Sequence, residues 1–546
     1  MMVLGLHLGH DATACVMSDG HILSVIEKER LVRVKHAGLM NIELIEAALE
    51  CAGVDIDQID FVAVTQTQNW PTVFFDRRNF YFEVDCERAH ELNAGSIGEQ
   101  ALKNLVKRQK ENHSLTVDRF TRLFLNDAIK NDGYGSLMTD YFKVESEHSS
   151  VLYSCEFPFF PKAFKEGYSL DTLFKLNSRS AKALLPTNKK RFRYHVPLKI
   201  YIHGREIPGA QFPHHLAHAA VAHYQSGKEK TAILTVDNGH CANAFGYTGG
   251  LFCAGEGTQM SVLGPNYTFH GHVYNRVGKQ LGWTTSAASG KLMGLAPYGK
   301  PRFFDPSMLG DYISVFDFDE NTVMDGLETI RPFFGFITSH AKDRNYDPFT
   351  PDIQDVLLPI SKDIASSTQH FFEEQTAYFA NILDVLCQRA DFEPEVLGMS
   401  GGCALNCPAN SMLHRIGRFS EVFVPPSVDD SGLALGAAFL TTHDLFDIPR
   451  VKQDPYSSTS AYLGRGWSKS QVEAAIEANI TDVSVEEPLN APDQAAKDLA
   501  DNQIIAWFEG KSEIGPRALG NRSILANPLF KDNWRRTNEI KTREHW

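Results

Sequence analysis

The sequence predicts an α/β protein whose first and larger part is an internal duplication of one sheet motif. Two observations support this prediction. Between residues 3 and 27, short runs of strand-forming residues alternate with polar turns, and Ser18-Asp19-Gly20 is a strong hairpin signal. Between residues 232 and 247, the same order recurs around the turn Asp237-Asn238-Gly239-His240. A strand, a polar turn and a returning strand therefore occur in both halves.

The strands of the two halves follow from their composition. In the first half we expect strands at 3–6, 13–17 and 22–27, because each run is rich in apolar, strand-forming residues and is bounded by Gly or Asp. In the second half we expect strands at 232–236 and 242–247. Duplicated sheet halves that face a cleft are typical of the superfamily of actin, heat-shock chaperones and sugar kinases. We therefore expect nucleotide phosphates to bind between the halves.

The middle of the chain predicts an insertion, a helix and a linker. Residues 67–205 are interpreted as an insertion with helical stretches such as 97–109. This insertion carries no motif for chemistry and would either cover the acceptor cleft or pack as core or lid. Residues 361–390 have the amphipathic pattern of a helix, and they lead to a buried strand at 396–399. The polar, proline-containing segment 446–462 is expected to link to a second domain.

The second domain is expected to begin with a helix at 468–479 and to continue with a strand at 504–508. The predicted domains are therefore 1–450, which includes the insertion, and 461–546. A length of 546 residues agrees with two domains, because it is too great for a single hydrophobic core.

Composition excludes several classes of function. The formal net charge of -14 argues against a surface that binds nucleic acid broadly. The first residues show no signal-peptide pattern, and no apolar run approaches the roughly 18 residues that would span a membrane. The nine cysteines are scattered and odd in number, which suits a reducing compartment. We therefore expect a soluble, cytoplasmic protein with no nucleic-acid or membrane partner.

The most informative motif is a pair of histidines in a predicted helix. His214 and His218 are four residues apart and therefore lie on one helical face. Imidazole suits Zn, Fe, Cu or Ni rather than Mg or Ca, and no Glu follows the first His as it does in the HExxH of zinc proteases. Asp430, at a predicted helix start, is the best available third ligand, although an acidic residue there is commonly only a cap. Two histidines and one carboxylate are typical of an Fe(II) site.

Two glycine-containing segments predict contacts with a ligand. Gly401-Gly402 follows a strand and would let backbone approach a ligand closely, although a plain strand-to-helix turn also explains it. The segment 515–523 carries Arg517 and Arg522 on a turn bounded by glycines, which suits bidentate capture of phosphate. Between residues 511 and 546, eight basic residues face four acidic ones. A solvated basic face is the alternative, but it would not need Gly-Pro and Leu between the charges, so phosphate binding is favoured.

Seven ordered motifs together resemble the O-carbamoyltransferases of antibiotic and nodulation-factor biosynthesis, of which tobramycin carbamoyltransferase is typical. The motifs are Gly9-His10-Asp11-Ala12, Glu29-Arg30 with Lys35-His36, the segment 214–220, the segment 290–299, the segment 401–406, Asp430-Ser431-Gly432 and the segment 515–523. The resemblance does not cover residues 67–205. It implies a duplicated actin-like (ASKHA, TsaD-like) domain followed by the N-terminal part of a YrdC-like α/β domain.

The resemblance also implies an activity. In this family the YrdC-like site makes carbamoyl adenylate from ATP and carbamoyl phosphate. The TsaD-like site then transfers the carbamoyl group to a hydroxyl of a small natural product and releases AMP. The sequence does not identify the acceptor. It also leaves the oligomeric state open, and a homodimer is one possibility.

Residue by residue, the resemblance assigns a metal site and a transfer site. His214, His218 and Asp430 would bind Fe²⁺ or another divalent metal, and Asp237 would be a further ligand or a catalytic contact to the nucleotide. The carbamoyl and acceptor end of the site would carry His10 and Lys35, where His10 could take the proton of the acceptor hydroxyl.

The resemblance further assigns residues to the two nucleotide sites. Around the adenosine part of the adenylate it places Gly401, Gly402, Asn406 and Asn410. In the second domain, the residues that would bind carbamoyl phosphate or nucleotide phosphates are Arg517, Arg522 and Lys541.

One departure from the family concerns the end of the chain. The family pattern continues beyond the segment that matches residues 541–546, first with another Arg and then with the rest of the YrdC-like domain. We therefore expect residues 461–546 to be only part of that domain. We also expect this polypeptide alone to make carbamoyl adenylate poorly.

Two other functions stay open at this point. One is threonylcarbamoyl transfer to tRNA, as in the TsaD relatives, against which the acidic charge and the YrdC-like motif count. The other is a non-catalytic, ATP-binding module of the actin type. That module needs no metal, so it leaves His214, His218 and the segment 515–523 unexplained.

Overall fold

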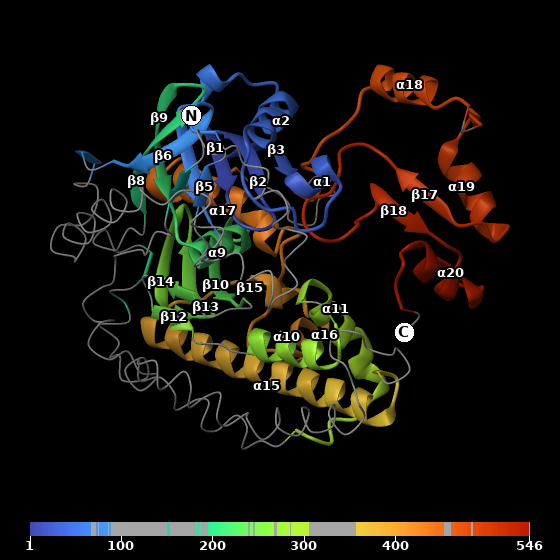
Figure 1. The fold of residues 1–546 in the computed structure, drawn as a ribbon. Coiled ribbons are helices and arrows are strands. Elements are labelled where there is room, and N and C mark those ends of the chain that lie inside the picture. Colours follow the sequence, from blue (N-terminus) through green and yellow to red (C-terminus); the bar gives the residue numbers. More distant parts are fainter. Residues whose placement is uncertain are drawn as a thin grey trace.

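Two β-sheets with surrounding helices dominate the part of the chain that the computed structural model describes (Figure 1). Most of the predicted insertion 67–205, its expected helix at 97–109, and the turn residues 238–240 lie outside this part. The described residues are 1–66, 72–74, 76–85, 87–88, 150–152, 182, 185–186, 195–237, 241–243, 246–266, 270–283, 285–304, 356–451, 460–481 and 484–544.

The first sheet has seven strands in the order β3-β2-β1-β4-β9-β8-β6. β1 is antiparallel to β2 and parallel to β4, and β4 is parallel to β9. The strands are β1 (Met2–His7), β2 (Thr13–Ser18), β3 (His21–Glu27), β4 (Phe61–Thr65), β6 (Phe80–Val84), β8 (Val196–Ile202) and β9 (Arg205–Gln211). The three strands that the sequence predicts at its start are confirmed.

The second sheet has five strands in the order β14-β13-β10-β15-β16. β10 is antiparallel to β13 and parallel to β15, and β15 is parallel to β16. The strands are β10 (Lys230–Thr235), β13 (Gly250–Glu256), β14 (Gln259–Asn266), β15 (Val396–Ser400) and β16 (Val422–Phe423). Their order and directions repeat those of β3-β2-β1-β4-β9, so the predicted duplication is confirmed.

One predicted strand is wrong. Residues 242–247 do not return beside β10, because β11 (Cys241–Asn243) and β12 (Gly246–Thr248) pair with each other as a separate hairpin. The returning strand is β13, which follows this hairpin. The inserted hairpin has the same apolar, strand-forming character as a sheet strand, and the sequence pattern alone could not separate them.

Helices form three layers around the sheets (Figure 1). On the outer face of the first sheet lies α2, and α9 and α17 lie between the two sheets. The outer face of the second sheet packs against α10, α11, α15 and α16, and α15 confirms the helix predicted at 361–390. The helices are α2 (Ile42–Ala52), α9 (His214–Gln225), α10 (His270–Gln280), α11 (Thr285–Leu295), α15 (Pro359–Ala390), α16 (Cys407–Ile416) and α17 (Leu433–Phe439).

The central helix α17 packs closely on both sides because it is built from small residues. Every residue of α17 is buried. A Cβ on Gly436 would lie 2.1 Å from Ala217 O in α9, and a Cβ on Gly5 of β1 would lie 2.2 Å from Ala434 O in α17. Glycine at these two positions therefore lets α17 touch α9 and β1 through backbone atoms, which fixes the spacing of the central layer.

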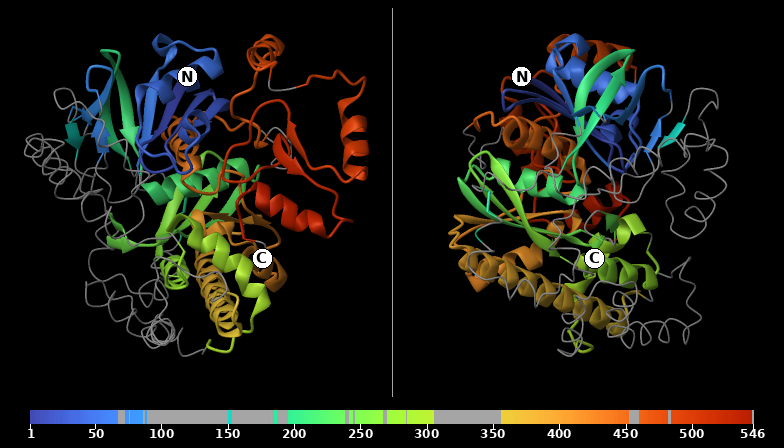
Figure 2. Two further views of the ribbon diagram at one scale, coloured as in Figure 1. Left: turned by 45° about the vertical axis from the view of Figure 1, so that its right-hand side comes forward. Right: turned by 90° about the vertical axis from the view of Figure 1, so that its left-hand side faces the viewer.

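The C-terminal region, residues 460–544, lies to one side of the two sheets (Figures 1 and 2). The predicted helix at 468–479 and strand at 504–508 are confirmed as α18 and β17. The elements are α18 (Lys469–Ala478), α19 (Ala491–Ala500), β17 (Ile505–Phe508), β18 (Arg522–Leu525) and α20 (Asp532–Ile540). Neither α18 nor α19 contains a buried residue, and the large side chains of Leu489, Leu529 and Trp534 are exposed.

The C-terminal region contacts the first half at the buried end of β3. Glu27 Oε1 accepts a hydrogen bond of 2.6 Å from the backbone N–H of Gly515. Burial raises the pKa of Glu27 to about 8, although the nearby Arg30 guanidinium and the Gly515 amide act in the opposite direction. A carboxyl group with this pKa makes the junction sensitive to pH.

Among the described residues, no helix combines the length and the hydropathy needed to cross a bilayer.

We expect Gly436→Ala to reduce the free energy of unfolding by about 1–3 kcal/mol, because the added methyl group forces α17 away from α9. Urea or thermal unfolding measures the effect. Gly290→Ala in α11 is the matched control, since a Cβ on Gly290 meets nothing within 4 Å. Equal losses in both variants would contradict the close packing of α17.

Glu27 predicts a pH dependence of stability. Its pKa is about 8 in the folded protein against an ordinary value of 4.5, so its contribution is complete below pH 4.5 and is lost as the pH rises through 8. Glu27→Gln keeps an oxygen that can accept the Gly515 hydrogen bond but cannot ionise. We expect the melting temperature of Glu27→Gln to rise relative to wild type between about pH 5 and pH 8.5. A difference that stays constant over this range would show that Glu27 does not titrate there.

Candidate functional site

Four side chains meet between the two sheets. His214, His218, Asp237 and Asp430 each offer a ligand atom, and these atoms all lie within 4.8 Å of one another. His214 Nε2 is 3.0 Å from Asp237 Oδ2, and His218 Nε2 is 3.3 Å from Asp430 Oδ1. The structure therefore brings together all the residues that the sequence predicts for a metal site. We call these four residues the His–Asp cluster.

Local structure explains how the histidines and Asp237 reach this cluster. α9 begins at His214, directly after Pro213 in an extended conformation, so His214 and His218 lie one turn apart on the same face. Asp237 follows the end of β10, and its backbone N–H donates to Gly249 O at the start of β13. The pair of histidines is thus aimed at the end of the central strand of the second sheet.

Asp430 reaches the cluster because a neighbouring residue does the capping. Asp430 opens a short 3₁₀ turn, Asp430–Gly432, that leads into α17. The side chain that caps this turn is Asp429, whose carboxylate accepts a hydrogen bond from Ser431 N–H. The cap that the sequence analysis considered for Asp430 is therefore supplied one residue earlier, and the Asp430 carboxylate faces the histidines.

The charges of the cluster suit a divalent metal ion. Burial alone would raise the pKa of Asp430, but the surrounding histidines, His214 foremost, lower it to about 2. Burial alone would lower the pKa of His214, but Asp430 and Asp237 raise it. His218 is fully buried, and neither of its ring nitrogens makes a hydrogen bond with a described residue. Two imidazoles, of which His218 has both nitrogens without a hydrogen bond to a described residue, and two carboxylates fit Fe²⁺ or Zn²⁺.

A second group of side chains lies against Asp430 and comes from the first half of the chain. His10 Nε2 is 3.3 Å from Asp430 Oδ2, and His10 Nδ1 is 2.9 Å from Asp11 Oδ2. Asp11 also pairs with His36, whose Nδ1 lies 3.0 Å from Asp11 Oδ1. Burial alone would lower the pKa of His10, but Asp430 and Asp11 raise it to about 10. The His10 ring is therefore held between a carboxylate of the cluster and one outside it.

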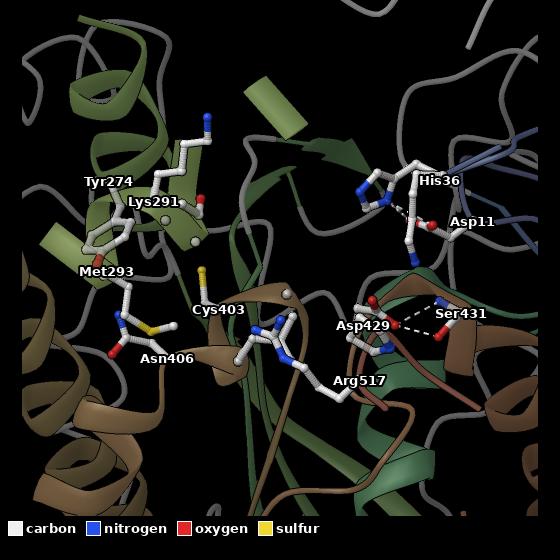
Figure 3. A pocket seen from close by; sticks show the side chains of 18 of the residues that line it. Asp11, His36, Tyr274, Lys291, Met293, Cys403, Asn406, Asp429, Ser431 and Arg517 are labelled. Atoms are coloured by element: carbon white, nitrogen blue, oxygen red, sulfur yellow. Dashed lines mark hydrogen bonds and ion pairs between the residues drawn. The ribbon is translucent and has the colours of Figure 1, made fainter. Parts of the chain in front are cut away.

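A pocket of about 640 Å³ extends from Asp11 and His36 toward the second half (Figure 3). Its lining comes from three parts of the chain. The first half contributes His36, the helices α10 and α11 contribute Tyr274 and Lys291, and the C-terminal region contributes Arg517. We call this cavity the transfer pocket. Because a loop of the C-terminal region enters its wall, the pocket is not built from residues 1–450 alone.

The predicted glycine segment, Gly401-Gly402, lies at the wall of the pocket. Gly401 has a φ of +95°, and a Cβ there would lie 2.3 Å from Val236 O, so the turn requires glycine. Gly402 follows and lines the pocket. The backbone can therefore approach a ligand at this point.

The two predicted asparagines have different places. Asn406 lines the pocket, but its amide pairs with Gln369 of α15 through hydrogen bonds of 2.9 and 3.0 Å. Its oxygen also caps α16. Asn410 donates to Ala404 O and is not part of the described pocket lining. Asn406 therefore forms part of the pocket wall, but its side-chain amide is already hydrogen-bonded within the protein.

The predicted cations also divide into two groups. Lys35 and Arg517 line the pocket, and Lys35 Nζ is 2.6 Å from Glu29 Oε1. Arg522 and Lys541 do not belong to the described lining. The Arg522 guanidinium donates to backbone oxygens, Gly510 O among them, and lies 3.6 Å above the ring of Phe508. The structure thus brings two of the four cations to the pocket.

Several pocket residues were missed by sequence reasoning. His36 and Lys291 stand inside quoted motifs, so the motifs themselves contained the signal. Tyr274 had none, because its place is set by a contact between distant helices: Tyr274 Oη donates to Gln369 Oε1 at 2.6 Å, and the two residues are 95 positions apart in sequence. Such a contact between two helices cannot be read from local spacing.

Comparison with known proteins covers nearly the whole chain. The nodulation protein NolNO of Sinorhizobium fredii is 26% identical over 549 residues, which cover 98% of this chain and 61% of that protein. The 3'-hydroxymethylcephem-O-carbamoyltransferase of Amycolatopsis lactamdurans is 40% identical over 157 residues, which cover 28% of this chain and 27% of that protein. This chain therefore spans less than two thirds of the length of either relative.

Two family models match in the order of the chain. The crystal structure of Plasmodium falciparum glycerol kinase with ADP superposes with a TM-score of 0.31 and 10% identity, over 89% of this chain and 99% of that one. The fold of this chain is defined by the strand order of its two sheets and not by this similarity. The model of the carbamoyltransferase N-terminus matches residues 2–439, and that of the carbamoyltransferase C-terminus matches residues 496–546. The chain belongs to the carbamoyltransferase family.

Proposed function

We propose that this chain carries the transfer site of an O-carbamoyltransferase. The substrate would be carbamoyl adenylate, formed from ATP and carbamoyl phosphate, and the acceptor would be a hydroxyl of a small natural product. One observation carries the proposal. His218 of the His–Asp cluster and His10 each lie 3.3 Å from the Asp430 carboxylate, next to a pocket of about 640 Å³ that Asp11 and Gly402 line.

The proposed reaction is an acyl transfer. The acceptor oxygen attacks the carbamoyl carbon, a new C–O bond forms, and the bond from that carbon to the phosphate oxygen breaks to release AMP. The neutral form of His10 accepts the proton of the hydroxyl, and Asp11 holds the ring in orientation through Nδ1. Gly401 and Gly402 would contact the nucleotide through backbone.

A metal ion fits the His–Asp cluster. Its proposed ligands are His214, His218, Asp237 and Asp430, with Fe²⁺ as the expected ion. When bound, the ion would supply positive charge that offsets the two carboxylates and stabilises the departing phosphate. The high pKa of His10 derives from Asp430 and Asp11, so neutralising Asp430 would also bring His10 closer to the pKa of a useful base.

The proposed division of labour follows the two domains. Residues 1–450 would hold the transfer site, and residues 461–546 would belong to a YrdC-like part that takes part in making carbamoyl adenylate. The name of the cephem-O-carbamoyltransferase relative points to a hydroxylated cephem as its acceptor, so a small hydroxylated molecule is the proposed acceptor class. A net charge of -14 disfavours tRNA as the acceptor. The His–Asp cluster disfavours a module that only binds ATP.

We expect the purified protein to bind about one divalent transition-metal ion per chain, and His218→Ala to lose it, because a buried imidazole ligand cannot be replaced by water alone. Elemental analysis after reconstitution with Fe²⁺ measures the stoichiometry. His223→Ala is the control on the same helix, since His223 bonds to Thr231 and Gly257 away from the cluster. Unmutated protein that binds no metal would favour the non-catalytic module.

We expect His10→Gln to lower kcat for carbamoyl transfer by roughly 10²- to 10⁴-fold, because the acceptor proton loses its base. The assay supplies carbamoyl adenylate and 3'-hydroxymethylcephem as the probe acceptor and detects the carbamoylated product by mass spectrometry. His203→Ala is the control, because His203 is exposed and pairs with Glu46. Full activity in His10→Gln would remove His10 from the mechanism, and absence of product in wild type would count against the cephem class of acceptor.

A further inference from the structure

The loop that carries Arg517 is gripped by two side chains of the first half. The N–H of Gly515 donates to Glu27 Oε1 at 2.6 Å, and Arg30 Nη2 donates to Gly515 O at 3.0 Å. Arg30 Nε also lies 3.5 Å from Glu27 Oε2, so the two side chains that hold Gly515 are in contact with each other. Both polar groups of one backbone residue in the C-terminal region are therefore satisfied by the N-terminal half. We call this arrangement the Gly515 latch.

The backbone around Gly515 is tightly packed. Gly515 has a φ of +87°, and a Cβ there would lie 2.1 Å from Pro426 O, in the segment that leads to Asp429 and Asp430. The preceding residue, Ile514, is buried in the central core with α9 and α17. The loop is thus confined on three sides, by Glu27 and Arg30, by Pro426, and by the core.

Arg517 follows the latch by two residues and lines the transfer pocket (Figure 3). Within the described part of the chain its guanidinium makes no hydrogen bond or ion pair. Two other lining cations are already paired with carboxylates, Lys35 with Glu29 and Lys291 with Glu544. Arg517 is therefore a cation that the latch delivers to the pocket and that stays available to an anion.

We propose that Glu27 and Arg30 are positioning residues that make Arg517 a phosphate-binding residue of the transfer pocket. This inference rests on the proposed function, because the anion it assigns to Arg517 is the phosphate of a nucleoside monophosphate or its carbamoyl anhydride. It also changes the role expected from the sequence, which places Arg517 in the second domain alone. A planar guanidinium can hold two phosphate oxygens at once, and a fixed loop lowers the entropy lost on binding.

The latch also explains why Arg517 and not Arg522 is assigned to the ligand. Arg522 is used within the C-terminal region, where its guanidinium bonds to backbone oxygens and stacks on Phe508. Arg30 does not line the pocket, so it can act on a ligand only through the loop. Loss of Arg30 should therefore resemble loss of Arg517, although Arg30 touches no ligand.

Isothermal titration calorimetry with AMP, carried out on the full chain, tests the proposal. We expect Arg517→Ala to weaken AMP binding by roughly 10- to 100-fold, which is the loss of charge-assisted hydrogen bonds. Arg30→Ala should weaken it by a similar factor. The double variant should be no worse than Arg517→Ala, because both changes remove the same interaction. Arg30→Lys, which retains a donor, should recover part of the affinity. Arg535→Ala, an exposed arginine paired with Asp532 and Glu539, should bind like wild type.

Two controls make the result decisive. Hydrogen exchange in residues 511–521 should accelerate in Arg30→Ala and not in Arg535→Ala, while the melting temperature shows that both variants are folded. Arg543→Ala measures the other arginine of the lining. Wild type that does not bind AMP, an unchanged affinity in Arg517→Ala, or independent and additive losses for Arg30 and Arg517 would each overturn the proposal.

The same variants separate this inference from the proposed function. Non-additive losses of AMP affinity without any carbamoylated product would leave the latch intact and remove the transfer activity. Carbamoyl transfer in which Arg517→Ala leaves the KM for carbamoyl adenylate unchanged would do the opposite. A raised KM with kcat nearly unchanged is the expected result for Arg30→Ala, because the variant loses phosphate binding and keeps His10.

Discussion

The buried carboxylate of Asp430 is the interaction on which the site depends. An ionised carboxylate is costly to bury unless charged partners surround it. Asp430 is 4% exposed and lies within 3.3 to 3.8 Å of imidazole nitrogens of His7, His10, His214 and His218. These histidines come from the first half and from the helix between the sheets, whereas Asp430 precedes α17 in the second half. One side chain therefore ties the two halves together at the point where chemistry is proposed.

Much of the fold could be predicted from the sequence, because its signals are local. Polar turns such as Ser18-Asp19-Gly20 separate apolar runs of strand length, and the duplicated strand order follows from the recurrence of that pattern. The exception at 242–247 has a physical cause. A hairpin that pairs with itself and a strand that joins the sheet share the same composition, and only the tertiary partner distinguishes them.

The candidate site was predictable where its residues follow local rules. The four-residue spacing of His214 and His218 sets one helical face, and Gly401 stands where a positive φ is needed. The rest depends on distant contacts. The pairing of Asn406 with Gln369, and the entry of Arg517 into a pocket shared with the first half, are set by packing between segments far apart in sequence. The capping of the turn by Asp429 rather than Asp430 likewise depends on which carboxylate the histidines attract.

The close contact of Gly5 with α17 has a consequence for biosynthesis. β1 ends at His7, whereas α17, the helix that covers one of its faces, begins only at Leu433. At roughly 5–20 residues per second, that face stays uncovered for about 20–90 s while the intervening chain is translated. The apolar face of β1 therefore stays exposed to solvent during this interval. A chaperone that shields this face would have its greatest effect before α17 emerges from the ribosome.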